Sequence, residues 1–366
     1  MAVPSLTRKE LNRATLARQM LLERETTGTV EAVERLAGLQ AQLARPPFIG
    51  LWSRVAGFRR EHLSEALTQR DVVRAPMMRC TLHLVSARDY LRHRPNVAPV
   101  LERAMKAILR DRAKDLDVEK LSAATAAYLE GGPRTFEDIR AHLDTLGLPG
   151  DQRAKGYAVR THLPLVQVPE ETEWAFPGTA AFTTAASWLG QPIPTTEPDL
   201  PALVRWYLAA FGPATPTDAQ TWSGFTALRD TFEAMRPELA TFRDDRGREL
   251  FDLPGAPRPE ATTRAPARFL PDFDNVILAH DDRSRLIAHE HRPRVSLKNL
   301  QVLPTFMVDG MVSGTWKVEK GRGTAILALE PFDALSKKGR DELSEEGQGL
   351  LRFLEPAAKK LEVRLS

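Results

Sequence analysis

Apolar positions in the first part of the chain recur every three or four residues, the period of an amphipathic helix. This spacing predicts helices over 7–22, 30–42 and 62–70, the second stopped by Pro46-Pro47. The apolar, β-branched run over 79–85 predicts a strand. Three helices followed by a strand are the outline of a winged helix-turn-helix unit.

A seven-residue pattern, G-P-x-T-x-x-D, occurs at 132–138 and again at 212–218. Gly and Pro end one helix, and Thr then caps the next helix while the Asp reaches back to it. Each copy lies between predicted helices and is followed by a predicted hairpin. The helices are expected at 118–129, 153–163, 200–211 and 225–235, and the hairpins at 165–176 and 239–253. The repeat therefore predicts two further winged-helix units.

Prolines crowd the stretch 254–271, which reads as a linker, and the apolar period then changes to two. Strands are expected at 275–279, 302–309, 311–318 and 324–329, and a last helix at 340–354. Asp309-Gly310 is a strong hairpin signal between two of these strands. We expect an α+β fold with three tandem winged helix-turn-helix units and a β-rich, barrel-like C-terminal part. The expected boundaries are 1–115, 116–198, 199–256 and 257–366.

Composition excludes several classes of protein but says little about the function. The net charge of the 366 residues is only +3, with 39 arginines and 12 lysines. Arginine matches phosphates well, but the codon usage of a GC-rich genome explains the same excess. The single cysteine, Cys80, excludes a disulfide framework and a Cys-based zinc site. Without an apolar run of about 18 residues or a secretory signal, we expect a cytoplasmic protein with no membrane partner.

Few familiar site motifs are present. The sequence has no phosphate-binding loop and no dinucleotide fingerprint. His280 with His289 and His291 comes near to metal-ligand spacing, and the alternate residues His289 and His291 could form a ligand pair, but nothing supplies clear third and fourth ligands. We therefore interpret that stretch as a solvated polar loop and expect no metal and no cofactor.

Six strings across the chain point to one family. They are Gly38–Gln42, Pro46–Arg54, Arg79–Val85, Phe211–Thr215, Phe269–Asn275, and Val308–Gly310 with Gly314–Trp316. Together they resemble the bacterial AlkZ-like DNA glycosylases, from about residue 7 to the C-terminus. The resemblance implies a fold of three winged-helix motifs around a β-barrel. It also implies that Gln40 and Gln42 are the family's Gln-apolar-Gln motif, whose Gln-ending form is associated with azinomycin-type interstrand crosslinks at guanine N7. An Asp-ending form is associated with broader N7-alkylguanine repair.

A glutamine amide has no useful pKa and cannot act as a general base. N7-alkylguanine already carries positive charge, so it leaves readily, and the enzyme need only place a water and oxygen dipoles near C1′. We expect Gln40 and Gln42 to orient that water through their oxygens. Double-stranded DNA with alkylated or crosslinked guanine is the expected partner, and no obligate protein partner is inferred. Phosphate contacts are expected from Arg45, Arg54, Arg92, Arg94 and Arg110.

Two questions stay open at this stage. His83 lies in the predicted strand and is either a buried structural residue or a catalytic one. The basic stretch after residue 92 is either a DNA-contacting surface or a solvated helix face. The rival function is a DNA-binding regulator or architectural protein without catalysis, because fold alone does not settle function. A second rival acts on N7-alkylguanine monoadducts only. No lysine lies near the glutamine pair (Lys9 is the closest in sequence), so we expect a monofunctional enzyme.

Overall fold

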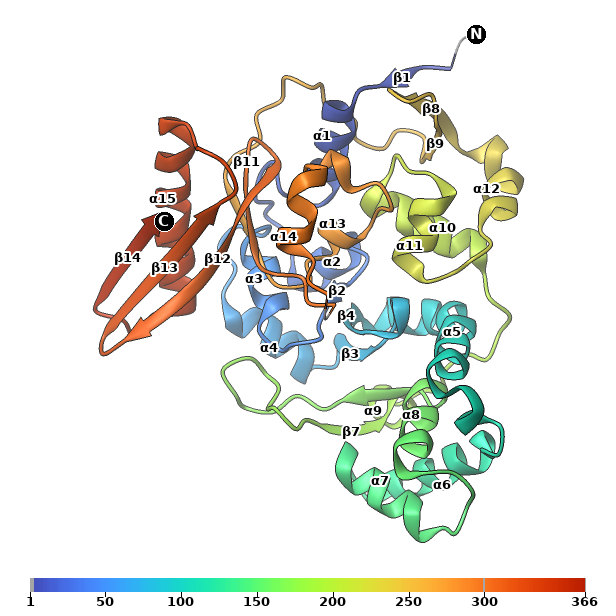
Figure 1. The fold of residues 1–366 in the computed structure, drawn as a ribbon. Helices are drawn as coiled ribbons and strands as arrows, with labels where there is room; N and C mark the ends of the chain where they lie inside the picture. Colours follow the sequence, from blue (N-terminus) through green and yellow to red (C-terminus); the bar gives the residue numbers. More distant parts are fainter. Residues whose placement is uncertain (1–2, 299, 366) are drawn as a thin grey trace.

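A computed structural model describes residues 3–298 and 300–365. Helices and three sheets alternate along the chain, so the expected α+β class is confirmed. The helices α6–α8 lie at one end of the molecule in Figure 1, and β12–β14 with α15 form a layer at one side. Among the described residues, no helix has the length and apolar character needed to cross a membrane.

The N-terminal part is helical, as the spacing of apolar residues predicts, but with two differences. Its helices are α1 (Arg8–Arg18), α2 (Thr29–Arg35), α3 (Pro46–Trp52), α4 (Arg60–Thr68) and α5 (Ala87–Leu109). The second predicted helix stops early, because a tight turn with Gly38 at φ +81° leads into the strand β2 (Leu39–Gln40). Pro46 and Pro47 begin α3 instead of ending a helix, since proline is well tolerated in a first turn.

Both copies of the G-P-x-T-x-x-D repeat form the predicted capping box. Thr135 and Asp138 cap α7, and Thr215 and Asp218 cap α11, with side chain and backbone bonded in both directions. The helices of this region are α6 (Val118–Glu130), α7 (Phe136–Thr145), α8 (Gln152–His162), α9 (Ala185–Leu189), α10 (Leu200–Phe211), α11 (Pro216–Ser223) and α12 (Arg229–Met235). The assignment of three winged-helix units stays a prediction.

A six-stranded antiparallel sheet lies across the predicted boundary at residue 115. Its order is β2-β4-β3-β6-β7-β5. The other strands are β3 (Val72–Pro76), β4 (Leu82–Ser86), β5 (Arg134–Thr135), β6 (Leu165–Gln167) and β7 (Ala181–Thr184). The two halves of the sheet meet at β3 and β6, where Arg74 pairs with Gln167. The first two predicted units therefore share one sheet.

The chain's first helix packs against segments that come much later. In a small sheet, β1 (Ser5–Leu6) pairs with β8 (Ala240–Asp244), which forms a hairpin with β9 (Glu249–Asp252). Asn12 of α1 donates to the carbonyl oxygens of Arg285 and Gly310, both at 2.8 Å. The N-terminal helix is thus held by residues nearly 300 positions away.

The C-terminal part is an open sheet and not a barrel. Its strands, in order, are β10 (Arg268–Leu270), β11 (Thr305–Val308), β12 (Met311–Gly321), β13 (Thr324–Pro331) and β14 (Lys360–Leu365). The sheet ends at β10 and β14, which do not pair, and β14 runs parallel to β13, so the barrel-like expectation is wrong. The strand expected over 275–279 is the short helix α13 (Asn275–Leu278), because Asp274 caps it. The other two C-terminal helices are α14 (Arg292–Val295) and α15 (Lys337–Leu354).

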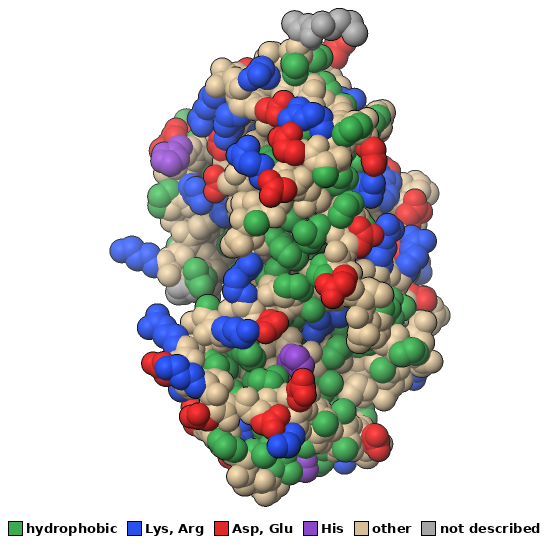
Figure 2. All heavy atoms as spheres, turned by 90° about the vertical axis from the view of Figure 1, so that its right-hand side faces the viewer, with side chains coloured by type: hydrophobic (Ala, Val, Ile, Leu, Met, Phe, Trp, Pro, Cys, Tyr) green, Lys and Arg blue, Asp and Glu red, His purple; other side chains and the backbone are tan. Residues whose placement is uncertain are grey.

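Apolar packing joins these parts into one body. Leu343, Leu350 and Leu354 of α15 pack on Leu327 and Leu329 of β13. A second cluster lies around α2, α3 and α4 and includes Ala41, the residue between the two glutamines. Figure 2 shows acidic and basic side chains mixed over one face of the molecule. A hollow opens about half-way up one edge in that view, with Lys and Arg side chains above and below it.

Candidate active site

Gln40 ends the strand β2 at the edge of the six-stranded sheet, and Gln42 lies in the bend that follows. Gln40 pairs with His83 of β4, and the pairing continues as the Ala41 N–H donates to the Leu82 carbonyl at 2.7 Å. Alternate residues of an extended chain point to opposite sides. Ala41 therefore packs into the apolar cluster at 1% exposure, on the opposite side from Gln40. Gln42 is exposed in the bend after β2, so the pair follows a strand and does not end a helix.

The two glutamines differ in how firmly they are held. Gln40 is 7% exposed, and its Oε1 accepts a hydrogen bond from Nη2 of Arg79 at 2.8 Å. Gln42 is exposed, and its Oε1 lies 3.4 Å from the Leu82 N–H, near the limit of a hydrogen bond. Gln40 is thus fixed by the protein, whereas Gln42 remains free to move toward a substrate.

Arg74 of β3 holds the backbone of this segment. Its guanidinium donates to the Ala41 carbonyl from Nε at 2.9 Å and from Nη2 at 2.7 Å, and stacks 4.7 Å from the Phe176 ring. Burial, followed by the charge of Arg160, lowers the pKa of Arg74 to about 10. Arg74 therefore stays protonated at neutral pH and brings a positive charge close to the glutamine pair.

Arg79 connects three distant parts of the chain. Besides Gln40, its guanidinium donates to Oδ1 of Asn275 at 3.1 Å and to the Trp222 carbonyl. Its backbone is left-handed, with φ 55°, and Cys80 follows at φ 58°. Conformations of this kind in residues other than glycine cost of order 1–3 kcal/mol and persist where surrounding contacts enforce them. Burial and the charge of Arg283 lower the pKa of Arg79 to about 10, so it too is charged at neutral pH.

The loop between β10 and α13 supports the same segment from the other side. Asn275 donates from Nδ2 to the Gly38 carbonyl at 3.1 Å. Asp274 binds Arg54 with both carboxylate oxygens, at 2.8 and 2.9 Å. Asp272 lies 3.8 Å from Arg45, and burial raises the pKa of its carboxyl. Asp272, Asp274 and Asn275 thus each meet a residue between 38 and 54.

His83 lies beside Gln40 and is fully buried. Its Nδ1 lies 3.0 Å from the Thr81 carbonyl, which can only accept, so the ring proton is on Nδ1. Burial and the charge of Arg79 lower the pKa of His83 to about 3. The imidazole is therefore neutral at physiological pH, its one N–H is held by the Thr81 carbonyl, and its lowered pKa makes it a weak base, which favours the structural interpretation.

The five arginines expected at phosphates divide into two groups. Arg45 is partly exposed, and Arg92 and Arg110 are exposed on α5 and just after it. Arg54 is 1% exposed and paired with Asp274, and Arg94 is 5% exposed and directed to the carbonyls of Thr161 and His162. Arg54 and Arg94 therefore do not have the exposure that the expected phosphate contact requires. Both side chains bind groups inside the protein.

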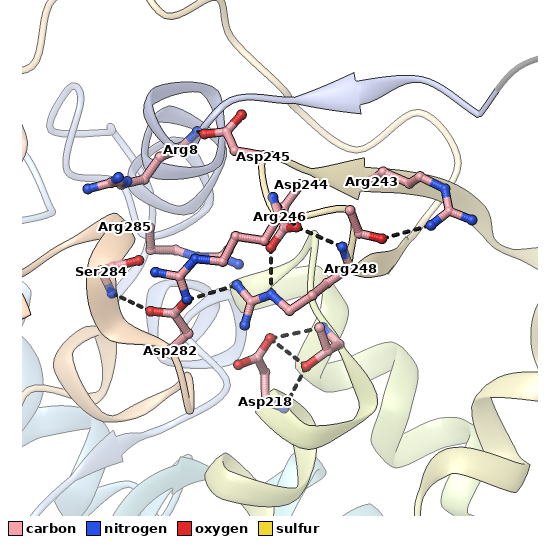
Figure 3. A network of polar contacts seen from close by, with 12 residues as sticks. Arg8, Asp218, Arg243, Asp244, Asp245, Arg246, Arg248, Asp282, Ser284 and Arg285 are labelled. Atoms are coloured by element: carbon pink, nitrogen blue, oxygen red, sulfur yellow. Dashed lines mark hydrogen bonds and ion pairs between the residues drawn. The ribbon is translucent and has the colours of Figure 1, made fainter.

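The histidines considered as metal ligands are separated by the fold. His280 is buried and its Nε2 contacts the Phe211 carbonyl at 3.0 Å, while His291 pairs with Asp333 at 2.9 Å and His289 begins a short 3-10 turn. Across residues 3–298 and 300–365, no group of three or more His, Cys, Asp or Glu side chains could hold a metal ion. The acidic neighbour Asp282 belongs to the ionic network in Figure 3, where Arg248 donates to it at 2.8 Å.

A groove is lined in part by Arg45, which follows Gln42 by three residues. It has a volume of about 740 Å³ and is bordered by Arg45 and Asp272 on one side and by β12 and β13 on the other. Lys317 and Arg364 contribute positive charge, and Glu319 and Glu330 negative charge. The groove is open to solvent and larger than a single base needs.

Sequence reasoning missed three residues of the site: Arg74, Arg79 and Asn275. Arg79 and Asn275 belong to two of the segments that resemble the family, Arg79–Val85 and Phe269–Asn275. No local sequence pattern shows that the two residues are in contact. Arg74 does leave a signal, because it interrupts the apolar run Val72–Pro76 in a fully buried strand. A buried arginine needs internal acceptors, and the backbone around the glutamines supplies them.

Comparison with known proteins gives one consistent result. A family model described as DNA glycosylase AlkZ-like matches residues 33–353. The interstrand DNA cross-link repair glycosylase of Streptomyces sahachiroi is 26% identical over 326 residues, which cover 83% of this chain and 85% of that protein. The solved structure of Streptomyces sahachiroi DNA glycosylase AlkZ has the same fold, with a TM-score of 0.80 and 22% identity over 99% of this chain and 100% of that one. Because the family model spans most of its length, this chain belongs to the AlkZ-like DNA glycosylase family.

Proposed function

We propose that this protein hydrolyses the N-glycosidic bond of N7-alkylguanine in duplex DNA, as a monofunctional glycosylase. The observation that carries the proposal is that Arg74 and Arg79 hold the segment of Gln40 and Gln42: Arg79 donates to the Gln40 side chain, and Arg74 donates to the backbone at Ala41 and Gln42. Neutral amides beside positive charge suit the binding of water and of a polyanionic strand. They do not suit general-base attack on an unmodified base.

The chemistry of the substrate supports this choice. Alkylation at N7 makes the guanine cationic, so the base can leave without protonation. General acid–base assistance is typically worth about 10²–10⁴-fold, and a substrate primed to break can dispense with it. What remains for the protein is to hold the water at C1′ and the sugar in the reactive arrangement, which is a matter of positioning and fixed dipoles.

We further propose that the substrates include interstrand crosslinks of the azinomycin type. The relative from Streptomyces sahachiroi is named for cross-link repair. A crosslinked guanine is tied to the opposite strand and cannot turn freely into a closed pocket. The open groove beside Arg45, of about 740 Å³, leaves room for the bulk of such an adduct. Arg45, Arg92 and Arg110 are the proposed phosphate contacts, and they would weaken with salt.

The test is a base-release assay on two duplexes, one with N7-methylguanine and one with an azinomycin crosslink. The wild-type protein should produce abasic sites in both. Gln42→Ala and Gln40→Ala should each lose at least 10²-fold in rate while keeping DNA affinity, because they remove groups that act on the reacting atoms. Gln191→Ala, a change of an exposed glutamine after α9, is the matched control and should behave as wild type.

The outcomes separate the rival functions. Sequence-preferring binding to undamaged duplex with no base release from either substrate would indicate a regulator. Release from the methylated duplex alone would restrict the enzyme to monoadducts. Full activity in the double variant Gln40→Ala/Gln42→Ala would contradict the assignment of the site.

A further inference from the structure

Gln40 presents its amide to the site in a definite orientation, and Arg79 sets that orientation. We propose that Arg79 is a positioning residue that binds the oxygen of Gln40 and so turns the amide NH₂ toward the DNA, making Gln40 the hydrogen-bond donor and Gln42 the acceptor for the attacking water. This inference deepens the proposed function and rests on it. It revises the expectation that both glutamines act through their oxygens.

The orientation of Gln40 follows from the chemistry of its partner. A guanidinium has five N–H donors and no acceptor, so the amide atom 2.8 Å from Nη2 of Arg79 must be the oxygen. The nitrogen of the same amide then points away from Arg79. The orientation of the Asn275 amide follows in the same way, because its oxygen faces Arg79 and its nitrogen faces the Gly38 carbonyl. The two amides and the guanidinium therefore form a chain with consistent donors and acceptors.

The geometry of Arg79 keeps this orientation from changing. Its backbone is held at φ 55°, and its side chain is tied to the Trp222 carbonyl at the end of α11 and to Asn275 at the start of α13. In the described residues no carboxylate forms an ion pair with Arg79. Its charge is therefore not cancelled locally and polarises the Gln40 carbonyl, which makes the NH₂ a better donor.

Gln42 is free to take the complementary role. Its backbone carbonyl accepts from Arg74 at 3.3 Å, but its exposed side chain makes only a 3.4 Å approach to the Leu82 N–H among the described residues, so a water or sugar can displace that contact. A water held between a donor and an acceptor has one lone pair on the Gln40 NH₂ and one hydrogen on the Gln42 oxygen. Its second lone pair is then left for C1′. Two acceptors would bind both hydrogens and leave neither lone pair in contact with the protein.

The reaction balances without an acid. The water oxygen forms a bond to C1′ as the bond from C1′ to N9 breaks, and the electron pair of that bond neutralises the cationic alkylguanine. The proton of the water passes to solvent. No oxidant, reductant or co-reactant other than water takes part.

The decisive experiment compares Gln40→Glu with Gln42→Glu in single-turnover base release from a duplex containing N7-methylguanine. Both variants add the same negative charge. Glutamate at position 40 keeps the contact with Arg79 but has no N–H, so the rate should fall at least 10²-fold. Glutamate at position 42 keeps an acceptor, so its loss should be at least tenfold smaller. Equal losses, or a smaller loss at position 40, would overturn the proposal.

A double-mutant cycle tests the part played by Arg79. Arg79→Gln should lower the single-turnover rate with little change in DNA affinity, and Arg79→Lys should recover part of that rate. In a Gln40→Ala background, Arg79→Gln should have almost no further effect, because the group that it positions is gone. Independent, multiplicative losses would show a purely structural role. If Arg79 variants do not fold, the comparison of the two glutamate variants still decides the matter.

The control for both experiments is Gln191→Glu, which adds the same charge at an exposed site and should leave the rate as in wild type. A wild-type protein that releases no base would refute the proposed function. A wild type that is active, together with an active Gln40→Glu variant, would refute the present inference alone.

Discussion

The two copies of the capping motif have the same local structure and very different surroundings. In the first copy, Thr135 and Asp138 cap α7 at the surface. In the second, Asp218 is 3% exposed and its other oxygen accepts the Asp281 N–H at 2.9 Å, close to His280 and Arg285. Figure 3 shows Asp218 next to the ionic network of Arg248 and Asp282. The same pattern of four shared residues, G-P-x-T-x-x-D, thus makes a surface cap in one place and an internal joint in the other.

The ends of the two capped helices differ as well. The first, α7, ends at Thr145 and is followed by Gly147, whose surroundings are open. The second, α11, ends at Ser223 beside Arg79, to which Trp222 supplies a carbonyl. The second copy of the motif therefore lies at the far end of a helix that supports the candidate active site, whereas the first copy does not.

The largest effect is expected from Asp218→Ala. The change leaves the partly buried donors of Thr215 and Asp281 without an acceptor and removes the buried negative charge near Arg285. Loss of one member of a buried polar network should lower the free energy of unfolding by about 3 kcal/mol. Chemical denaturation measures this change, and base release should fall too because α11 supports Arg79. A loss no greater than that of Thr135→Ala, about 1 kcal/mol for an exposed cap, would contradict the comparison.

A smaller effect is expected from Gly224→Ala, at the end of α11. Its φ is +87°, and a Cβ there would lie 2.8 Å from Val100 and 3.3 Å from the Arg79 Cα. The expected loss is about 2 kcal/mol, from the left-handed backbone and the close contact together, with a reduced rate of base release. Gly147→Ala, at the end of α7, has φ +64° and nothing within 4 Å, so it should lose about 1 kcal/mol and no activity. Equal losses of activity in Gly224→Ala and Gly147→Ala would contradict the inference that α11 supports the candidate active site.

The smallest effect concerns pH. Hydrogen bonds from Thr135 lower the pKa of Asp138 below its ordinary value of about 3.9. A carboxyl with a lowered pKa contributes stability above the unfolded-state pKa and loses it as the pH falls through the folded-state pKa. The difference in unfolding free energy between wild type and Asp138→Asn should therefore be full at pH 6 and shrink below about pH 4. Denaturation curves at several pH values would measure it, and a difference that grows on acidification would show that the sign is wrong.

Local signals predicted the elements that carry their own stop and start residues. The helix α10 has the predicted limits, since Asp199 caps its start and Gly212 follows its end. The hairpin of β8 and β9 was predicted from Asp244–Gly247 for the same reason. The strand β14 was missed because its partner β13 lies more than 30 residues earlier and pairs in parallel, which leaves no turn signal.

The site itself was predicted only in part. The resemblance indicated Gln40 and Gln42, and their catalytic role stays a prediction. The position of Gln40 in a strand instead of a helix follows from Gly38, whose left-handed backbone fits closely against Val85. The partners of Gln40 come from residues 79 and 275, and only tertiary folding brings those together.

The docking of α1 onto late segments has a consequence for biosynthesis. At roughly 5–20 residues per second, the ribosome delivers Arg285 and Gly310, which accept hydrogen bonds from Asn12, some tens of seconds after α1 has been made. Until then Asn12 and the buried Arg13 of α1 lack the acceptors that they have in the native fold. In the nascent chain, α1 therefore cannot make these native contacts until almost the whole protein has emerged.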